Sequence, residues 1–210
     1  MIWLPKSIRL DYQIILNWIS TGSSVLDLGC GDGALLAMLI KIKNVHGHGI
    51  EINENAVRKC VAQGLNVFQQ DIDIGLSEYA DKSFYYVILN QTLQQVKNPS
   101  FVLKEALRVG KRVIVGFPNF AHYSARFSIF FRGKVPVTHA LPYEWHNTPN
   151  LHFLSILDFK DYCKKKNIKI EDQAFTSKNK RVRFLPNFRA EFGFFLLSDK
   201  LRIIDPHINK

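Results

Sequence analysis

The fold of this 210-residue chain is indicated by the stretch Val25-Leu26-Asp27-Leu28-Gly29-Cys30-Gly31-Asp32-Gly33. An apolar run ends on an acid, three alternating glycines follow, and a helical pattern begins directly afterwards. A strand, a tight turn and a helix N-terminus in this order open a nucleotide-binding α/β unit. Glycine permits positive φ and a close approach of backbone to ligand, and the unpaired N–H groups of the helix favour an anionic group. We therefore expect a nucleotide at this turn.

The type of nucleotide depends on the acid. Gly29, Gly31 and Ala34 fit the dinucleotide pattern G-x-G-x-x-G/A. A carboxylate at Asp27, however, would repel a pyrophosphate and suits a cation, such as the ammonium of S-adenosylmethionine (SAM). With Gly33 the turn reads D-x-G-x-G-x-G, which resembles the first motif of class I SAM-dependent methyltransferases. A purely structural turn is less favoured, since three glycines cost backbone entropy.

Two more acids follow the next two predicted strands. Glu51 ends the strand expected at 45–52, 24 residues after the first acid, where a carboxylate can accept both ribose hydroxyls. Asp71 follows the strand expected at 65–70 and can bind the exocyclic amine of adenine, while Ile72 packs on the ring. Glu51 could instead cap a helix, and Asp71 could be an ordinary loop acid. Three acids after three successive strands favour a nucleoside site.

The order of predicted elements indicates an α/β fold. Strands and helices alternate over roughly 100 residues, which predicts a doubly wound parallel sheet with helices on both faces. The expected helices are 7–20, 32–42, 53–63, 98–109 and 155–167, and the seven expected strands are 24–28, 45–52, 65–70, 84–90, 111–117, 168–175 and 190–198. The last two strands have no helix between them, so we expect an antiparallel hairpin at the edge of a mostly parallel, Rossmann-like sheet.

Composition is that of a globular protein, with 47% hydrophobic and 22% charged residues. No apolar stretch reaches the roughly 18 residues of a membrane span, and the N-terminus has no signal-peptide layout. The three cysteines are too few and scattered for a disulfide framework or a zinc site. We therefore expect a cytoplasmic protein without metal and without membrane association.

Charge is unevenly distributed along the chain. Residues 1–100 carry 8 basic and 9 acidic side chains, whereas residues 101–210 carry 20 and 9. The basic half could meet nucleic acid or an acidic protein surface, or could be a solubilising face. Without an aromatic and basic stacking motif of a known RNA module, nucleic acid ranks last.

The pattern changes within residues 119–150. A helix-length stretch rich in phenylalanine also contains Arg126 and Arg132, and an irregular loop rich in proline, aromatic residues and histidine follows it. A loop of this length is often a lid or a binding surface. The aromatic residues could equally cover the protein's own core. We expect one domain over 1–210, with 119–150 as an inserted helix and a lid or partner loop.

Several longer segments resemble the methionine biosynthesis protein MetW family. They are Val-Ile-Leu-Asn-Gln-Thr-Leu-Gln at 87–94, Arg-Val-Gly-Lys-Arg at 108–112, Phe-Pro-Asn-Phe at 117–120, Arg-Gly-Lys-Val-Pro-Val-Thr at 132–138, Leu-Pro-Tyr at 141–143, Thr-Pro-Asn at 148–150, Leu-Pro-Asn at 185–187 and Arg-Ala-Glu at 189–191. The resemblance implies a methyltransferase-like protein of methionine biosynthesis that binds SAM or S-adenosylhomocysteine (SAH) and acts with a homoserine O-acyltransferase (MetX). The expected nucleoside site comprises Asp27, Gly29, Cys30, Gly31, Gly33, Glu51, Ile52, Asp71, Ile72 and Asn90.

Two departures from the methyltransferase pattern bear on activity. Class I enzymes often open the fourth strand with an acid and place a histidine after it, where this chain has Tyr85 and Gln95. Asn90, Gln91 and Gln94 offer no general base near neutral pH, although a lid could bring in a histidine. The histidines in question are His139, His146 and His152. No catalytic residue is assigned. We expect an accessory protein, with a small-molecule methyltransferase as the alternative.

Overall fold

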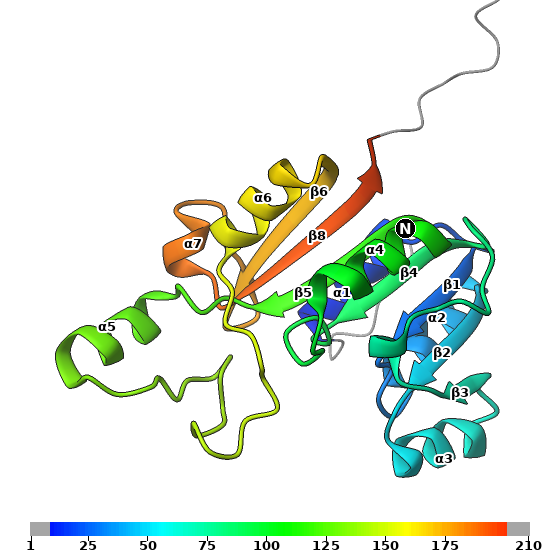
Figure 1. Cartoon of the computed structure of the whole chain (residues 1–210), viewed down its shortest axis with the longest axis horizontal. Coiled ribbons are helices and arrows are strands. Elements are labelled where there is room, and N and C mark those ends of the chain that lie inside the picture. The colour runs from blue at the N-terminus through cyan, green and yellow to red at the C-terminus, as the bar shows by residue number, and fades with distance from the viewer. Residues whose placement is uncertain (1–8, 201–210) are drawn as a thin grey trace, which may run out of the picture.

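The computed structural model describes residues 9–200, and a single eight-stranded sheet organises them (Figure 1). The strands are β1 (Ser24–Leu28), β2 (His46–Glu51), β3 (Val67–Gln69), β4 (Phe84–Asn90), β5 (Gly110–Pro118), β6 (Ile168–Ser177), β7 (Lys180–Arg181) and β8 (Phe192–Asp199). Their order across the sheet is β3-β2-β1-β4-β5-β8-β6-β7. Neighbours among the first five strands are parallel, so their carboxyl ends meet at one edge.

The predicted fold class is confirmed: the sheet is mostly parallel, and β8 runs antiparallel to both β5 and β6. The number of strands differs slightly from seven. The eighth strand, β7, has two residues and pairs antiparallel with the end of β6 in a hairpin. Sequence reasoning also missed the short helix α7 (Pro186–Arg189) between the last two long strands. At four residues, α7 is too short to leave a helical periodicity in the sequence.

Helices lie close to their predicted positions because the sequence contains their caps. The longer helices are α1 (Leu10–Trp18), α2 (Ala34–Lys43), α3 (Glu54–Ala62), α4 (Pro99–Val109), α5 (Tyr123–Arg132) and α6 (Ile156–Lys165), and η1 (Ile72–Ile74) is a 3₁₀ turn. Asn98 caps α4 ahead of Pro99, and Ser155 and Asp158 form a capping box on α6. The second helix begins later than expected, because Gly33 is its N-cap in a left-handed conformation. None of the helices between residues 9 and 200 combines the length and apolarity needed to span a bilayer.

Two layers of helices cover the sheet, and the alternation of side chains in β4 shows why. Val87 and Leu89 belong to the larger apolar cluster, which contains α4 and α6. Tyr86 and Ile88 belong to the cluster on the other face, with residues of α1 and α2. Each fully buried side chain of this size contributes about 1.5–3 kcal/mol relative to an exposed one. Successive side chains of β4 therefore point to opposite faces of the sheet, and each face is covered by its own pair of helices.

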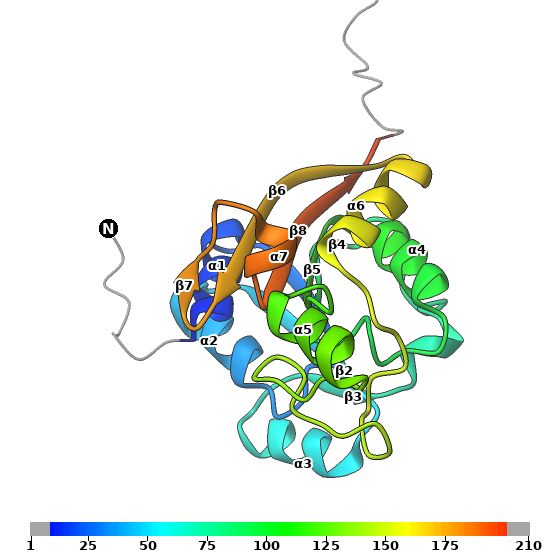
Figure 2. The ribbon, with the colours of Figure 1, turned by 90° about the vertical axis from the view of Figure 1, so that its left-hand side faces the viewer.

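The segment between β5 and α6 departs from the layered plan. Figure 1 shows α5 projecting beyond the carboxyl end of β5, and in Figure 2, seen from that side, α5 lies in front of the sheet. Only Ala125 of this helix is buried. Residues 133–155 have no regular structure and return to the sheet at α6. The aromatic residues of α5 therefore do not complete the core of the protein.

Candidate nucleoside site

A cleft of about 500 Å³ opens at the carboxyl ends of β1, β2, β3 and β4. Its wall is formed by Gly29, Gly31, Ile50, Glu51, Ile52, Gln70, Asp71, Ile72, Asp73, Asn90, Gln91, Thr92, Gln95, Val96, Lys97 and Leu151. The structure thus brings together seven of the ten residues predicted for the nucleoside site. This position, outside the carboxyl ends of parallel strands, is where open α/β sheets bind ligands.

The glycine turn is held in place by β2. The backbone N–H groups of Gly29 and Cys30 both donate to the carbonyl of Ile50, at 2.8 and 3.1 Å. The N–H of Gly31 donates to Oε2 of Glu51 at 2.8 Å. Gly31 has a φ of +57°, and a Cβ added to it would meet nothing within 4 Å. The turn therefore exposes bare backbone on the cleft wall beside an acid.

Glu51 is a rigidly placed carboxylate. Its Oε1 accepts hydrogen bonds from the backbone N–H groups of Ile52 and Asn53, both at 2.9 Å, and its Oε2 accepts the one from Gly31. A carboxylate offers about four lone-pair sites, so one site on Oε2 remains for a ligand hydroxyl. This geometry supports one ribose hydrogen bond rather than the two expected from the sequence. It also gives Glu51 a structural task, since the carboxylate ties the glycine turn to β2.

Asp71 and two isoleucines form the adjoining part of the wall. Oδ1 of Asp71 accepts a hydrogen bond from the N–H of Asp73 at 2.9 Å and thereby caps η1. Within residues 9–200, no donor reaches its second oxygen, which is therefore open to an amine. Ile52 is 62% exposed and Ile72 only 9% exposed, so most of the apolar surface beside these acids comes from Ile52. An aromatic base fits such a setting.

Asn90 closes the cleft at the end of β4. Its Nδ2 lies 3.4 Å from Oδ2 of Asp11 in α1, which orients the amide. Its Oδ1 is buried, has no donor in the described part of the chain and lies beside Gly116. The side chain thus connects the cleft wall to the first helix.

Three predicted site residues lie behind the wall. Asp27 is buried on the same face of β1 as Val25, and burial, followed by the charge of Glu51, raises the pKa of its carboxyl to about 7. Cys30 packs among apolar residues near Cys60, and burial raises the pKa of its thiol. A Cβ on Gly33 would lie 2.9 Å from the sulfur of Cys60. These positions shape the turn from below.

Other wall residues were missed by sequence reasoning because they lie in loops. Thr92, Val96 and Lys97 follow β4, and Leu151 comes from the long segment after α5. The N–H groups of residues 151 and 152 donate to the carbonyl of residue 94 at 2.9 and 3.1 Å, which fastens that segment to the cleft rim. The loop after β4 begins at Gln91, whose φ of +63° is unusual for a residue other than glycine.

Tyr85 has no bearing on chemistry in the cleft. It lies at the opposite end of β4 from Asn90, with its ring near the cationic groups of Lys111 and Arg112. Tyr85 therefore contributes nothing to the cleft wall. Gln95, in contrast, does line the cleft, where a histidine would have been the expected base.

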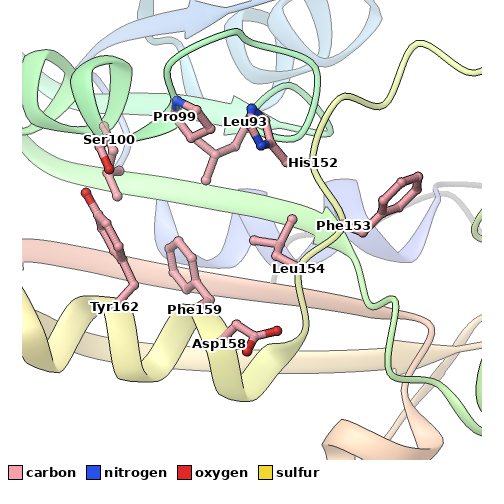
Figure 3. Close-up of a pocket in the computed structure, with 10 residues that line it drawn as sticks. Leu93, Pro99, Ser100, His152, Phe153, Leu154, Asp158, Phe159 and Tyr162 are labelled. Atoms are coloured by element: carbon pink, nitrogen blue, oxygen red, sulfur yellow. The ribbon is translucent and has the colours of Figure 1, made fainter.

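None of the three candidate histidines is on the cleft wall. His146 lies 3.6 Å from Glu144 in the long loop, and His139 lies 3.5 Å from Glu191. His152 lines a different pocket, of about 420 Å³, between α4 and α6 (Figure 3). That pocket is largely apolar, with Phe159 and Tyr162 on the α6 side. Among the described residues, the cleft accordingly has no histidine on its wall.

Similarity to known proteins agrees with this fold. A family model described as methionine biosynthesis protein MetW matches residues 9–197. A relative from Rhodopirellula baltica, named bifunctional methionine biosynthesis protein MetXA/MetW, is 36% identical over 195 residues. That match covers 88% of this chain and 31% of the relative, so the chain spans about a third of the relative's length.

Solved structures extend the comparison at the level of fold. A SAM-dependent methyltransferase from Archaeoglobus fulgidus superposes with a TM-score of 0.67 at 14% identity, covering 90% of this chain and 91% of that one. The [4+2]-cyclase SpnF gives 0.65 at 13% identity, covering 90% and 80%. The same fold thus supports more than one chemistry. The family is fixed by the sequence match over most of its length: the chain belongs to the MetW family of methionine biosynthesis proteins.

Proposed function

We propose that this protein binds SAM or SAH in the cleft and acts with a homoserine O-acyltransferase (MetX) in methionine biosynthesis. The observation that carries the first part is the placing of Glu51 and Asp71 on one wall, beside the glycine turn whose Gly29 and Gly31 also line the cleft. Each carboxylate has a counterpart on such a nucleoside: a ribose hydroxyl for Glu51 and the adenine amine for Asp71. The apolar surface of Ile52 and Ile72 supports the ring.

Charge favours SAM or SAH over a dinucleotide. The wall carries three carboxylates, of Glu51, Asp71 and Asp73, against the single ammonium of Lys97. A pyrophosphate would meet like charge here, whereas the amino group of SAH would be attracted. Isothermal titration calorimetry with SAM, SAH and NAD tests this directly. Tighter binding of NAD than of SAH would reject the nucleoside assignment.

The partner is suggested by the Rhodopirellula relative, whose name joins MetXA and MetW in one polypeptide. In that relative, a single chain holds the MetXA and MetW parts together. Where the two parts are separate chains, a surface of one has to bind the other. The aromatic face of α5 suits that task. Phe130 and Phe131 are 81% and 73% exposed, and α7 adds Phe188, whose ring lies 5.8 Å from that of Tyr123 and 6.4 Å from that of Phe127. We call these five residues the α5–α7 surface.

Basic residues beside this surface indicate the character of the partner. The guanidinium of Arg126 lies 5.6 Å from the centroid of the Phe188 ring, and Arg132 and Lys134 follow at the end of α5. Aromatic residues and arginine dominate the energetics of protein interfaces. The acyltransferase is therefore expected to present an apolar patch with acidic residues around it, whereas a second copy of this chain would bring repelling charges.

Replacing Phe130 and Phe131 with serine tests the interface. The variant should stay folded and keep its SAH affinity, because both side chains are exposed and neither lines the cleft. It should lose the acyltransferase in a pull-down with the untagged enzyme. Phe68→Ser is the matched control, since Phe68 is an exposed phenylalanine of β3. Capture at full strength by the double variant would show that the α5–α7 surface is not the interface.

A further inference from the structure

A second cavity, of about 660 Å³, adjoins the nucleoside cleft and shares Gln91 and Gln95 with it. Its walls come from the start of α1, the end of β5, the β6–β7 hairpin and the start of β8, and residues 139–143 and 150 cover it. Its volume is in the range of small-molecule sites. Unlike the apolar pocket of Figure 3, this cavity has charged groups of both signs on its wall.

Glu191 is the first reason to expect a ligand there. The residue is 5% exposed, and its Oε2 accepts a hydrogen bond from the backbone N–H of Lys178 at 2.8 Å. Among residues 9–200, its one ion-pair partner is Nδ1 of the exposed His139, at 3.5 Å, and that imidazole is charged only when it is protonated. A buried carboxylate without a close cation is costly. An ammonium group in the cavity would supply the missing positive charge.

Gln94 is the second reason. It is 3% exposed and lines the same cavity. Its Nε2 donates to the carbonyl of Gln91 at 2.8 Å, which fixes the orientation of the amide, because the flipped form would set two oxygens together. Its Oε1 is then a buried acceptor without a donor among residues 9–200. The cavity wall therefore has acceptors in excess, and these favour a ligand that brings N–H groups.

The remaining charges indicate a carboxylate as well. Arg9 and Asp11 neutralise one another through a 2.7 Å ion pair. Lys178 contributes a further ammonium to the wall, from the two-residue turn between β6 and β7. We propose that this cavity binds a small zwitterionic α-amino acid, with its ammonium against Glu191 and its carboxylate against Lys178. This site is separate from the nucleoside cleft and goes beyond the proposed function.

Calorimetry with the full chain tests the proposal, in the presence and absence of SAH. The probes are the standard L-amino acids and L-homoserine, followed for the best of them by two analogues: the amine without the carboxylate and the acid without the amine. At least one amino acid should bind, and the affinity of each analogue should be lower than that of the amino acid by about tenfold or more. Absence of binding by every amino acid, or equal binding of either analogue, would overturn the proposal.

Two variants separate recognition from folding. Glu191→Gln keeps the shape and removes the charge, and should weaken amino-acid binding by about tenfold or more. Lys178→Gln alters an exposed turn residue and should weaken binding of the same amino acid. This variant tests the site even if Glu191→Gln does not fold. The matched control is Glu144→Gln, an exposed residue of the covering loop, which should bind as the unaltered protein does. SAH affinity is measured in parallel, so that failure of the amino-acid site and failure of the nucleoside site are distinguished. Unchanged amino-acid binding in Lys178→Gln and in a folded Glu191→Gln would refute the assignment.

Discussion

Asp27→Asn should change how the stability of this protein depends on pH. Burial, followed by the charge of Glu51, raises the pKa of the Asp27 carboxyl from its ordinary value of 3.8 to about 7. Between these two values the native state binds a proton that the unfolded state has released. Stability from this group is therefore fully present below about pH 4 and is lost as the pH rises through about 7.

The size of the effect follows from the shift. Each pKa unit corresponds to about 1.36 kcal/mol, so a shift of about three units is worth about 4 kcal/mol at most. Asparagine has nearly the same shape and does not ionise. Near pH 8 the Asp27→Asn variant should thus be more stable than the unaltered protein by up to about 4 kcal/mol, which is roughly 8–16 °C in Tm for a chain of this size. Near pH 4 the two proteins should be nearly equal.

Urea unfolding at about pH 4, 6 and 8 measures the difference, with Asp32→Asn as the control. Asp32 belongs to the same turn but is exposed, so its replacement should leave the pH dependence unchanged. A free-energy difference between Asp27→Asn and the unaltered protein that stays constant from about pH 4 to 8 would refute the reasoning. In that case Asp27 would keep one protonation state throughout.

Three other outcomes are expected. Glu51→Ala should weaken SAH binding by about tenfold to a hundredfold, since one charge-assisted hydrogen bond of about 1.5–3 kcal/mol is lost. The control Glu54→Ala replaces an exposed, ion-paired residue and should leave SAH affinity unchanged. If calorimetry gives Glu51→Ala the same SAH affinity as the unaltered protein, Glu51 is not part of the site. Gly33→Ala should lower the free energy of unfolding, measured with denaturant, by about 2 kcal/mol or more, because a Cβ there meets other side chains. Gly22→Ala, at a residue with a similar φ and open surroundings, should lower it by about 1 kcal/mol. Equal losses of stability in the two variants would contradict the packing argument. The isolated protein should transfer methyl groups weakly or not at all, since no histidine of residues 9–200 lines the cleft. Efficient turnover of one acceptor in a radiolabelled-SAM assay would disprove this.

The parallel half of the fold could be predicted because its signals are local. Alternating strands and capped helices each leave a periodic pattern. Glu51 ends β2 and Asp71 follows β3 by two residues, and the carboxyl ends of these parallel strands must share an edge. Asp27 has the same kind of position in the sequence, but its side chain points to the α1 and α2 face rather than to the cleft. The direction of a side chain near the end of a strand depends on pleat and twist, which a motif does not encode.

The rest of the site depends on loops. Lys97 and Leu151 reach the cleft by routes that follow no periodicity, and 54 residues separate them in the sequence. The aromatic residues of α5 posed the opposite problem. Phe130 has the composition of a core residue, and only tertiary structure shows that nothing in the described chain covers it. Burial is a property of the whole fold, so a hydrophobic pattern could not distinguish a core helix from an interface helix.

The place of β8 between β5 and β6 has a consequence for biosynthesis. The end of β5 precedes the start of β8 by 74 residues, and β6 can join the sheet only through β8. At 5–20 residues per second, a ribosome needs roughly 4–15 s to make that interval. During this time the nascent β5 has an open apolar edge, and β6 waits without a neighbour. Mispairing and capture by chaperones are therefore most probable in those seconds, before the last long strand has been translated.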